Sequence, residues 1–393
     1  MGSTLVRRRG PARLLKQSIA LCCALSLTCA PIPAARAQEA KPSPRVSVEN
    51  SNGEWYVEGA ERAGDARVEE FLGRQSLWLR NGTNVIRSGV GFTDGTIEFD
   101  VAPTERGNFV GILFRREAFP NQENIYLRIH RSGLYNAVQY APRVQGSSTW
   151  QLYPEFNATA ELPRNRWTRV RVEVRGTRLE VYLNERPQPV LTVPRLRGPA
   201  RSGGVAFWAR VNEQPEAWAA ALSNISIRPA ASETTANAAT NEAAAIPAAP
   251  AGTLTEWEVA GPVQAEGGAV TRLPALKDWR AARAEESGLV NLNRAARSAR
   301  GRWTMFARTT VKSSEARSAL LELGYSDDVT VFLNGEPVYA GVNGFESRHP
   351  EYMGFVKPGF ENVFLKLRPG DNEIALAVTD DQRFGWGFVA RLK

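Results

Sequence analysis

Hydrophobic and polar residues alternate along long stretches of this 393-residue chain. Residues 96–101 (Thr-Ile-Glu-Phe-Asp-Val) and 169–174 (Arg-Val-Arg-Val-Glu-Val) show the pattern clearly, with an apolar side chain at every second position. Because successive side chains of a β-strand point to opposite faces of a sheet, this period of two is typical of a strand with one buried face. Turn signals recur about every 8 to 12 residues, as they do in antiparallel sandwiches. The pattern therefore predicts an all-β fold.

One segment interrupts the pattern and divides the chain. Residues 229–252 are mostly Ala, Thr, Asn, Glu and Pro, and Ile246 is their only large apolar residue. Such a segment cannot bury a core, so we expect it to be disordered. Strand patterns return at residues 329–336 (Val-Thr-Val-Phe-Leu-Asn-Gly-Glu), which lead into an Asn-Gly hairpin turn. The predicted architecture is two antiparallel jelly-roll β-sandwiches, residues 38–228 and 253–393, joined by a flexible linker.

The first 37 residues have the composition of a signal peptide. A basic start is followed by a short apolar region at residues 18–30 and by small residues at 35–37 (Ala-Arg-Ala), the three parts that a secretory signal contains. We expect cleavage after Ala37 and a periplasmic or secreted protein of a bacterial envelope. No apolar run approaches the roughly 20 residues of a transmembrane helix, so no membrane span is expected.

This amino-terminal segment also changes the charge and the cysteine chemistry. The formal charge is +8, but residues 1–37 hold six of the 49 basic residues and none of the 41 acidic ones. The rest of the chain carries 43 basic and 41 acidic residues, a net charge of +2 that gives no support for a nucleic-acid partner. Cys22, Cys23 and Cys29 lie in the same segment, so the mature chain has no disulfide, thiol nucleophile or cysteine metal ligand.

Catalysis has limited support in the sequence. The two histidines, His130 and His349, lie in different predicted domains, which argues against Ser-His-Asp hydrolysis and against a zinc site. Glu98 and Asp100 are two residues apart on a strand and project from one face, as the two carboxylates of β-jelly-roll glycosidases do. Such enzymes typically carry a third acid in an E-x-D-x-x-E motif, and that position is Pro103 here. We keep Glu98 and Asp100 as the catalytic alternative, beside a solvated role.

A mixed aromatic and polar row is the better candidate for a ligand face. In the strand predicted at residues 124–130, the apolar residues point to the core and leave Tyr126, Arg128 and His130 on the other face. Three residues nearby in sequence could reach the same sheet: Arg115, Gln139 and Trp150. Aromatic rings stack on the C–H faces of sugars, and Arg and Gln side chains hydrogen-bond to hydroxyls. An ordinary polar face is the alternative, and Trp150 could belong to the core.

A loop of the second predicted domain is a further candidate. Four residues there could hold a calcium ion or a sugar: Asp380, Asp381, Arg383 and Trp386. The alternative is a simple acidic turn. Apart from this structural calcium, no cofactor is expected.

Three segments carry a resemblance to a known family. Residues 94–101 (Asp-Gly-Thr-Ile-Glu-Phe-Asp-Val), 110–115 (Val-Gly-Ile-Leu-Phe-Arg) and 204–209 (Gly-Val-Ala-Phe-Trp-Ala) are similar to strands of concanavalin A-like lectin/glucanase jelly rolls. On this basis residues 92–228 resemble the laminin-G and 3-keto-disaccharide hydrolase-like type. The resemblance implies a jelly roll, in a family that contains sugar binders, glycan-cleaving enzymes and adhesion modules.

The second predicted domain resembles another family. Residues 257–262 (Trp-Glu-Val-Ala-Gly-Pro), 325–335 (Tyr-Ser-Asp-Asp-Val-Thr-Val-Phe-Leu-Asn-Gly) and 367–372 (Leu-Arg-Pro-Gly-Asp-Asn) make residues 255–393 similar to a galactose-binding-like jelly roll. The resemblance implies a carbohydrate-binding appendage of the kind that accompanies glycoside hydrolases.

The sequence as a whole predicts an exported, non-catalytic protein that binds a glycan or polysaccharide through its jelly-roll faces. Two modest sites on one linker would gain avidity for a polymer. Two alternatives stay open: a glycoside hydrolase of the 3-keto-disaccharide hydrolase-like type, and an envelope scaffold that binds protein.

Overall fold

A computed structural model describes residues 45–47, 54–58, 64–116, 121–212, 214, 216–231 and 249–393. All of them belong to one compact unit that spans residues 42–393. The expected signal peptide at residues 1–37 and most of the expected linker, residues 232–248, lie outside the described residues. The helices of the described segments are all too short or too polar to span a lipid bilayer.

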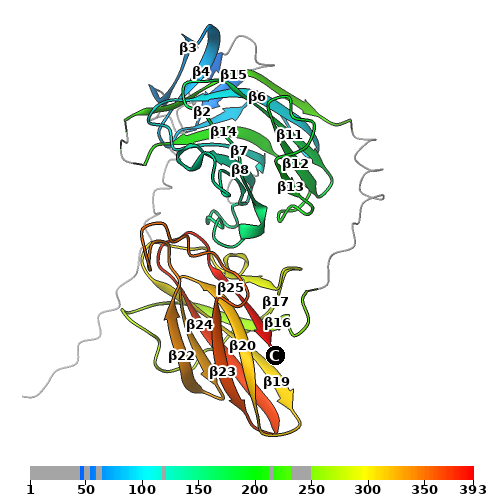
Figure 1. Ribbon diagram of the computed structural model, residues 1–393, viewed down its shortest axis with the longest axis vertical. Coiled ribbons are helices and arrows are strands. Elements are labelled where there is room, and N and C mark those ends of the chain that lie inside the picture. Colours follow the sequence, from blue (N-terminus) through cyan, green and yellow to red (C-terminus); the bar gives the residue numbers. More distant parts are fainter. Residues whose placement is uncertain are drawn as a thin grey trace, which may run out of the picture. The chain divides into compact units, whose positions relative to one another are not determined.

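The first part of the chain forms a sandwich of two antiparallel sheets (Figure 1). Its strands are β1 Arg45–Ser47, β2 Glu54–Val57, β3 Ala66–Phe71, β4 Arg74–Arg80, β5 Asn84–Arg87, β6 Gly95–Pro103, β7 Phe109–Arg116, β8 Glu123–Arg128, β9 Val138–Tyr140, β10 Asn157–Ala158, β11 Thr168–Arg175, β12 Arg178–Leu183, β13 Leu191–Val193, β14 Gly204–Arg210 and β15 Trp218–Pro229. Sheet A has the order β1-β2-β5-β14-β7-β8-β9-β10, and sheet B has the order β13-β12-β11-β6-β15-β4-β3.

The alternating pattern places the core of this first sandwich. Along β11, buried positions alternate with half-buried ones from Thr168 to Val174, as the sequence predicts. Ile97 of β6 and Ile112 of β7 are fully buried between the sheets. The residues between these core positions therefore form the outer face of each sheet.

The second part of the chain forms another antiparallel sandwich. Its strands are β16 Glu256–Gln264, β17 Arg280–Arg283, β18 Leu289–Asn291, β19 Trp303–Ser313, β20 Arg317–Ser326, β21 Asp328–Leu333, β22 Glu336–Val342, β23 Glu361–Leu367, β24 Gly370–Asp380 and β25 Gly387–Leu392. One sheet has the order β17-β16-β19-β24-β21-β22 and the other β18-β25-β20-β23. Asn334 and Gly335 both have positive φ between β21 and β22, which confirms the predicted hairpin turn. The predicted all-β fold with two sandwiches is correct.

The 3-10 helices whose bounds lie wholly within the described residues are η2 Ile129–Arg131, η3 Pro154–Phe156 and η4 Leu292–Arg294. The first of them corrects a prediction, because β8 ends at Arg128 and the strand does not continue to His130. The amide of Ile129 donates to the carbonyl of Asn108 (2.8 Å), and the amide of Ser132 donates to that of Ile129 (3.2 Å). These bonds turn the chain before the alternation can place His130 on the sheet.

The two sandwiches contact each other directly through the segment between β8 and η3. The Gln151 side chain accepts a hydrogen bond from Ser326 Oγ (2.9 Å) and donates one to the carbonyl of Met353 (3.1 Å). The Gln151 carbonyl accepts from the amide of Val356 (2.9 Å). A linker is therefore not the sole connection between the sandwiches, and the expected picture of two independent sites on a tether needs revision.

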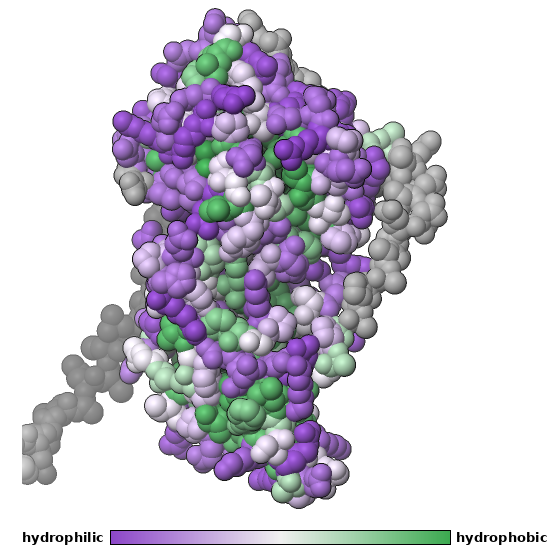
Figure 2. Space-filling model, viewed as in Figure 1, coloured by the Kyte–Doolittle hydropathy of each residue, from purple (hydrophilic) through white to green (hydrophobic). Residues whose placement is uncertain are grey.

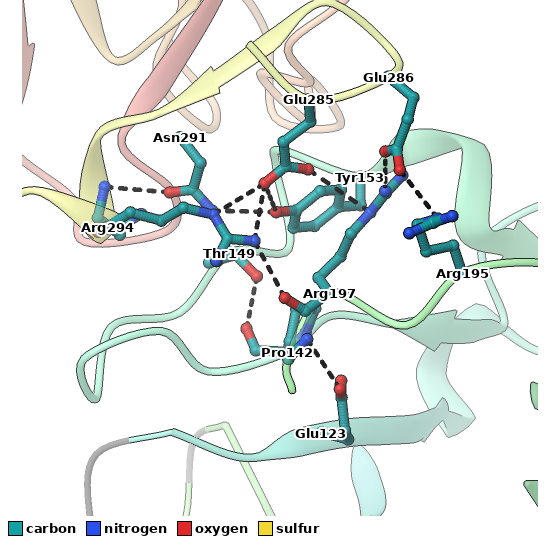
Figure 3. Close-up of polar contacts among 12 residues, drawn as sticks. Glu123, Pro142, Thr149, Tyr153, Arg195, Arg197, Glu285, Glu286, Asn291 and Arg294 are labelled. Atoms are coloured by element: carbon teal, nitrogen blue, oxygen red, sulfur yellow. Dashed lines mark hydrogen bonds and ion pairs between the residues drawn. The ribbon is translucent and has the colours of Figure 1, made fainter. Parts of the chain in front are cut away.

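An ionic network strengthens this contact (Figure 3). Glu285 of the second sandwich accepts a hydrogen bond from the hydroxyl of Tyr153 (3.0 Å) and lies 2.9 Å from Arg294 Nη2. Arg197 of the first sandwich reaches Glu285 with Nε at 3.5 Å and also pairs with Glu286. Because each of these charges has a partner of opposite sign, the network holds the two sandwiches in register.

Candidate ligand-binding face

One continuous row of residues crosses the outer face of sheet A. Trp208 of β14 pairs with Gly111 of β7, which pairs with Tyr126 of β8. Tyr126 pairs in turn with Gln139 of β9, and Gln139 pairs with Asn157 of β10. Directly paired residues of antiparallel strands project from the same face, so these five residues share one surface. We call them the sheet A row.

The indole of Trp208 lies flat across β7 because position 111 has no side chain. A Cβ atom at Gly111 would stand 2.2 Å from Trp208 Cε2, well inside contact distance. Trp208 Nε1 donates to Asn124 Oδ1 (2.9 Å), and Asn124 Nδ2 donates to the carbonyl of Ala141 (3.0 Å). The ring is therefore held in one orientation while part of it stays exposed.

Aromatic side chains continue from Trp208 along this face. The ring of Phe109 lies 6.4 Å from Trp208 in a stacked arrangement and 6.1 Å from Tyr126. Tyr126 is 5.7 Å from Trp208. Phe109 and Trp208 are half-buried, whereas Tyr126 is buried. Phe109 and Trp208 thus present partly exposed rings on a rigid support, which is the arrangement that stacks on a flat apolar ligand surface.

Arg128 lies beside the row, directly opposite Phe109 in the register of β7 and β8. Its guanidinium carbon is 6.0 Å from the Phe109 ring and 5.7 Å from the Trp150 ring. The side chain is only 6% exposed, and its Nε and Nη1 atoms are buried without a hydrogen-bond partner in the described residues. Burial lowers the pKa of Arg128 from its ordinary value.

The polar end of the sheet A row also has unused hydrogen-bonding groups. Gln139 Nε2 donates to Asn157 Oδ1 (2.5 Å). The other two atoms of these amides, Gln139 Oε1 and Asn157 Nδ2, are buried without a partner in the described residues. Native structures leave few buried polar atoms unpaired, so this acceptor and this donor are groups that a water molecule or a polar ligand could satisfy.

His130 lies at the margin of the face, in η2. Its Nδ1–H donates to the carbonyl of Asn108 (3.0 Å), and its ring is 4.7 Å from Phe109. Partial burial lowers the pKa of His130 to about 4, and the positive charges of Arg128 and Arg131 add to the effect. His130 is therefore neutral at physiological pH, outside the row in which the sequence placed it.

Trp150 reaches Arg128 from the loop between β9 and η3, and it also contacts the second sandwich. Its ring lies 5.7 Å from Phe345, 5.6 Å from Phe355 and 5.5 Å from Phe384. The side chain is half-buried. Trp150 thus joins the candidate face to the second sandwich and is neither a core residue nor a free ligand-binding ring.

Arg115 lies apart from the sheet A row, contrary to the prediction. It is 4% exposed and forms an ion pair with Asp94 (2.8 Å), and it donates to the carbonyls of Thr93 (2.8 Å) and Gly176 (2.5 Å). Its φ is 47°, and the pairing of β7 with β14 shifts register at this level. The bulge turns the side chain toward the β11–β12 turn of sheet B, where it ties the two sheets together.

The carboxylates of the catalytic alternative lie on the opposite sheet, in β6 of sheet B. Glu98 pairs with Arg228 and with Arg169 (3.5 Å), and Asp100 pairs with Arg74 (2.5 Å) and Arg169 (3.4 Å). Burial opposes ionisation of Glu98, but Arg228 and Arg169 together hold its pKa below the ordinary value. These two carboxylates do not converge with Arg115 or His130.

The predicted loop of the second sandwich is occupied by its own contacts. Asp380 accepts hydrogen bonds from Ser298 Oγ and from the amide of Arg383 (2.9 Å), and Asp381 pairs with Arg302 (3.1 Å). Trp386 is fully buried and donates to a backbone carbonyl, so the structure assigns it to the core. Within the described ranges, no three or more His, Cys, Asp or Glu side chains are grouped to hold a metal ion.

Two clefts elsewhere have paired charges. A cleft of about 410 Å³ in the second sandwich contains Arg302, which pairs with Asp328 (2.6 Å) and Asp381. A cleft of about 820 Å³ between the sandwiches is lined by the network of Arg197 and Glu285 (Figure 3).

The face shown in Figure 2 is mostly hydrophilic, with small apolar patches. Within the described residues, buried polar groups without partners are grouped most clearly around Arg128 and the sheet A row.

Sequence reasoning predicted Tyr126, Arg128 and Gln139 for this face but missed Phe109, Trp208 and Asn157. The alternation of residues 204–209 carried a signal for Trp208, because Val205, Phe207 and Ala209 belong to the main core of the first sandwich. Asn157 had no such signal, since its place depends on the pairing of a two-residue strand.

No protein-family model and no curated protein sequence matches the chain. Among solved structures, it is similar to a carbohydrate-binding module from Bacillus subtilis (14% identity, TM-score 0.33), over 45% of this chain and 96% of that one. It is also similar to a Bacillus subtilis protein of unknown function with a galectin-like fold (12%, 0.30), over 44% and 90% of the two chains. A third similar structure is a Bacillus licheniformis beta-glucanase (13%, 0.31), over 49% and 92%. These likenesses concern the fold alone.

Proposed function

We propose that the protein binds a carbohydrate on the outer face of sheet A and does not cleave it. The observation that carries this proposal is the composition of the sheet A row. The partly exposed ring of Trp208 stands at one end, and the unpaired amide atoms of Gln139 and Asn157 stand at the other. A glycan presents apolar C–H faces and rims of hydroxyls, so stacking at one end of the row and directional hydrogen bonds at the other could act on neighbouring sugar units of one chain.

The state of the paired carboxylates supports a role without catalysis. Glycoside hydrolysis usually needs one carboxyl group that stays protonated as general acid and a second that acts as base or nucleophile. Glu98 is held ionised by Arg228 and Arg169, and both Glu98 and Asp100 face away from the sheet A row. A hydrolase that used these two groups would need a second, separate substrate site on sheet B.

The second sandwich supports this proposal because it contacts Trp150, which lies at the edge of the candidate face. Trp150 contacts Arg128 on one side and three phenylalanines of the second sandwich on the other. In place of two tethered sites that act by avidity, we propose one face whose edge the second sandwich positions.

Export to the bacterial envelope remains part of the proposal, on the composition of residues 1–37. Amino-terminal sequencing of the chain recovered from the envelope of a bacterial host should begin at Gln38. Recovery of the uncleaved chain from the cytoplasm would contradict export.

The substitution Trp208→Ala tests the binding face. Binding of the full chain to a glycan array should weaken about tenfold or more, because the ring that stacks on the sugar is lost. The matched control is Trp167→Ala, which removes another half-buried tryptophan, next to β11 of sheet B, and should leave binding unchanged. Thermal unfolding of both variants checks that they fold. Equal binding by wild type and Trp208→Ala would contradict the proposal.

A further inference from the structure

We infer that the carbohydrate bound on sheet A carries an anionic substituent, a carboxylate or a sulfate ester, that pairs with the guanidinium of Arg128. This inference rests on the proposed function and names the chemical class of its ligand. It starts from the charge of Arg128, which none of the described residues balances with an ion pair.

Arg128 differs from Arg115 and Arg197, two other arginines whose side chains are shielded from water. Arg115 pairs with Asp94 and Arg197 pairs with Glu286, as buried charges in proteins generally do. Arg128 has neither an ion pair nor a hydrogen bond to its side chain among the described residues. Phe109 and Trp150 compensate in part, because aromatic faces attract a guanidinium, but they leave its N–H groups unused.

The surroundings of Arg128 add further positive charge. Besides burial, the electrostatic influences on Arg128 come, in order of size, from the hydroxyl of Tyr126, from Arg131 and from the hydroxyl of Tyr135. Arg131 donates to the amide oxygen of Asn136 (3.2 Å). Arg164, whose charge acts on the neighbouring His130, donates to the backbone carbonyls of Thr104 (2.8 Å) and Gly107 (2.7 Å). Neutral groups hold both side chains, so neither positive charge is cancelled by an ion pair in the described residues. A ligand that brings a negative charge would supply the missing partner.

The geometry suits an anionic group better than another hydroxyl. Arg128 Nε and Nη1 are shielded from water and Nη2 is not among the shielded atoms, so within the described residues a ligand would approach the guanidinium from the side of Nη2. A carboxylate or sulfate can accept two parallel N–H bonds from such a planar group. A neutral hydroxyl would leave the buried charge unbalanced. The free atoms of Gln139 and Asn157 would then bind hydroxyls of the same sugar unit.

Two matched pairs of polymers test the inference on the full chain. One pair is polygalacturonate and its methyl ester, and the other is dextran sulfate and dextran. We expect calorimetry in about 0.15 M salt to show at least tenfold tighter binding to the acidic member of one pair. Preference in the first pair identifies a carboxylate ligand, and preference in the second identifies a sulfate ester.

Variants of Arg128 assign the preference to this residue. Arg128→Met should abolish the preference for the acidic polymer. Arg128→Lys should keep a reduced preference, because an ammonium group cannot form two parallel N–H bonds to the anion. The matched control is Arg74→Met, because Arg74 also stacks on a tryptophan, Trp167 (5.0 Å), but has Asp100 as its partner. Arg74→Met should keep the full preference. Loss of the preference in both variants would indicate non-specific charge attraction and would overturn the inference.

Two further outcomes separate this inference from the proposed function. If neutral glycans bind and Trp208→Ala abolishes that binding, but no acidic polymer is preferred, the inference is wrong and the proposed function stands. If no glycan of any kind binds, both fail. An independent readout is the NMR titration of His130, whose pKa of about 4 should rise when an anion binds near Arg128, while His349 serves as the internal reference.

Discussion

The outer faces of the two sheets of the first sandwich both carry arginines stacked on aromatic rings. The two faces differ in how the charges of these arginines are balanced. Around sheet B, Arg67 stacks on Trp218 (4.4 Å) and Arg74 stacks on Trp167 (5.0 Å). Each of these guanidinium groups also has a carboxylate partner, Glu69 (2.8 Å) for Arg67 and Asp100 (2.5 Å) for Arg74. On sheet A, the stacked guanidinium of Arg128 has no such partner in the part of the chain that the structure describes.

This difference shows that stacking of arginine on tryptophan does not by itself mark a ligand site. On sheet B the charges are balanced within the protein, so the stacks need nothing further and serve to cover the sheet. On sheet A the stack leaves a buried charge and two amide atoms unpaired. The distinguishing feature of a binding face is therefore its unmet hydrogen bonds and charge, which a ligand can satisfy.

The largest expected effect compares a paired buried arginine with the unpaired one. Arg115→Met should lower the free energy of unfolding by about 3 to 5 kcal/mol, because Asp94 would stay buried without its partner. The free energy of unfolding of Arg128→Met should stay within about 1 kcal/mol of the wild-type value, because the substitution removes a desolvated charge that no described group balances. Urea unfolding of both variants measures the contrast. If Arg128→Met costs as much as Arg115→Met, Arg128 has a structural partner and the distinction between the faces fails.

A smaller effect comes from making sheet A resemble sheet B. Gln139 and Arg128 are diagonal neighbours on one face, so Gln139→Glu would place a carboxylate within reach of the guanidinium. We expect affinity for the preferred acidic polymer to fall about tenfold, with the free energy of unfolding unchanged or slightly raised. Calorimetry measures the affinity. The control Gln139→Met keeps the charge of the face and should keep the acidic preference. Full affinity in Gln139→Glu would show that the anion does not bind at Arg128.

The smallest effect concerns pH and the margin of the face. The pKa of His130 is about 4 in the folded protein and near 6.5 in an unfolded chain. The unfolded state therefore binds more protons between these values, so the contribution of His130 to stability is present above pH 6.5 and is lost as the pH falls toward 4. Because the ring is partly exposed, the loss should be below about 1 kcal/mol. The urea-unfolding midpoint of His130→Asn should change less with pH over this window than the midpoint of the wild type does. An equal dependence of the midpoint on pH in both proteins would mean that the ring is not desolvated.

Much of the fold could be predicted because local rules decide it. The period of two held along β11 and over residues 96–99 of β6, and Asn334-Gly335 supplied the positive φ angles that its hairpin needs. The same period correctly placed Tyr126 and Arg128 on one face of β8. These features depend on neighbours in sequence, which a single chain displays.

The failures all depend on contacts between distant residues. His130 left the strand because the amide before it bonds to Asn108, and Arg115 turned away because of a bulge against β14. The partners that neutralise Glu98 are brought to it from β11 and β15. None of these contacts follows from periodicity, since register between strands is set by the packed sandwich.

Trp150 has one further consequence. Its ring serves both the candidate face and the apolar contact between the sandwiches, so occupancy of the face and association of the two halves are thermodynamically coupled. A ligand that orders this ring would tighten the contact, and by reciprocity a tighter contact would raise affinity for the ligand. The two sandwiches should then unfold in a more concerted transition when the face is occupied, which makes unfolding cooperativity a measure of what the face has bound.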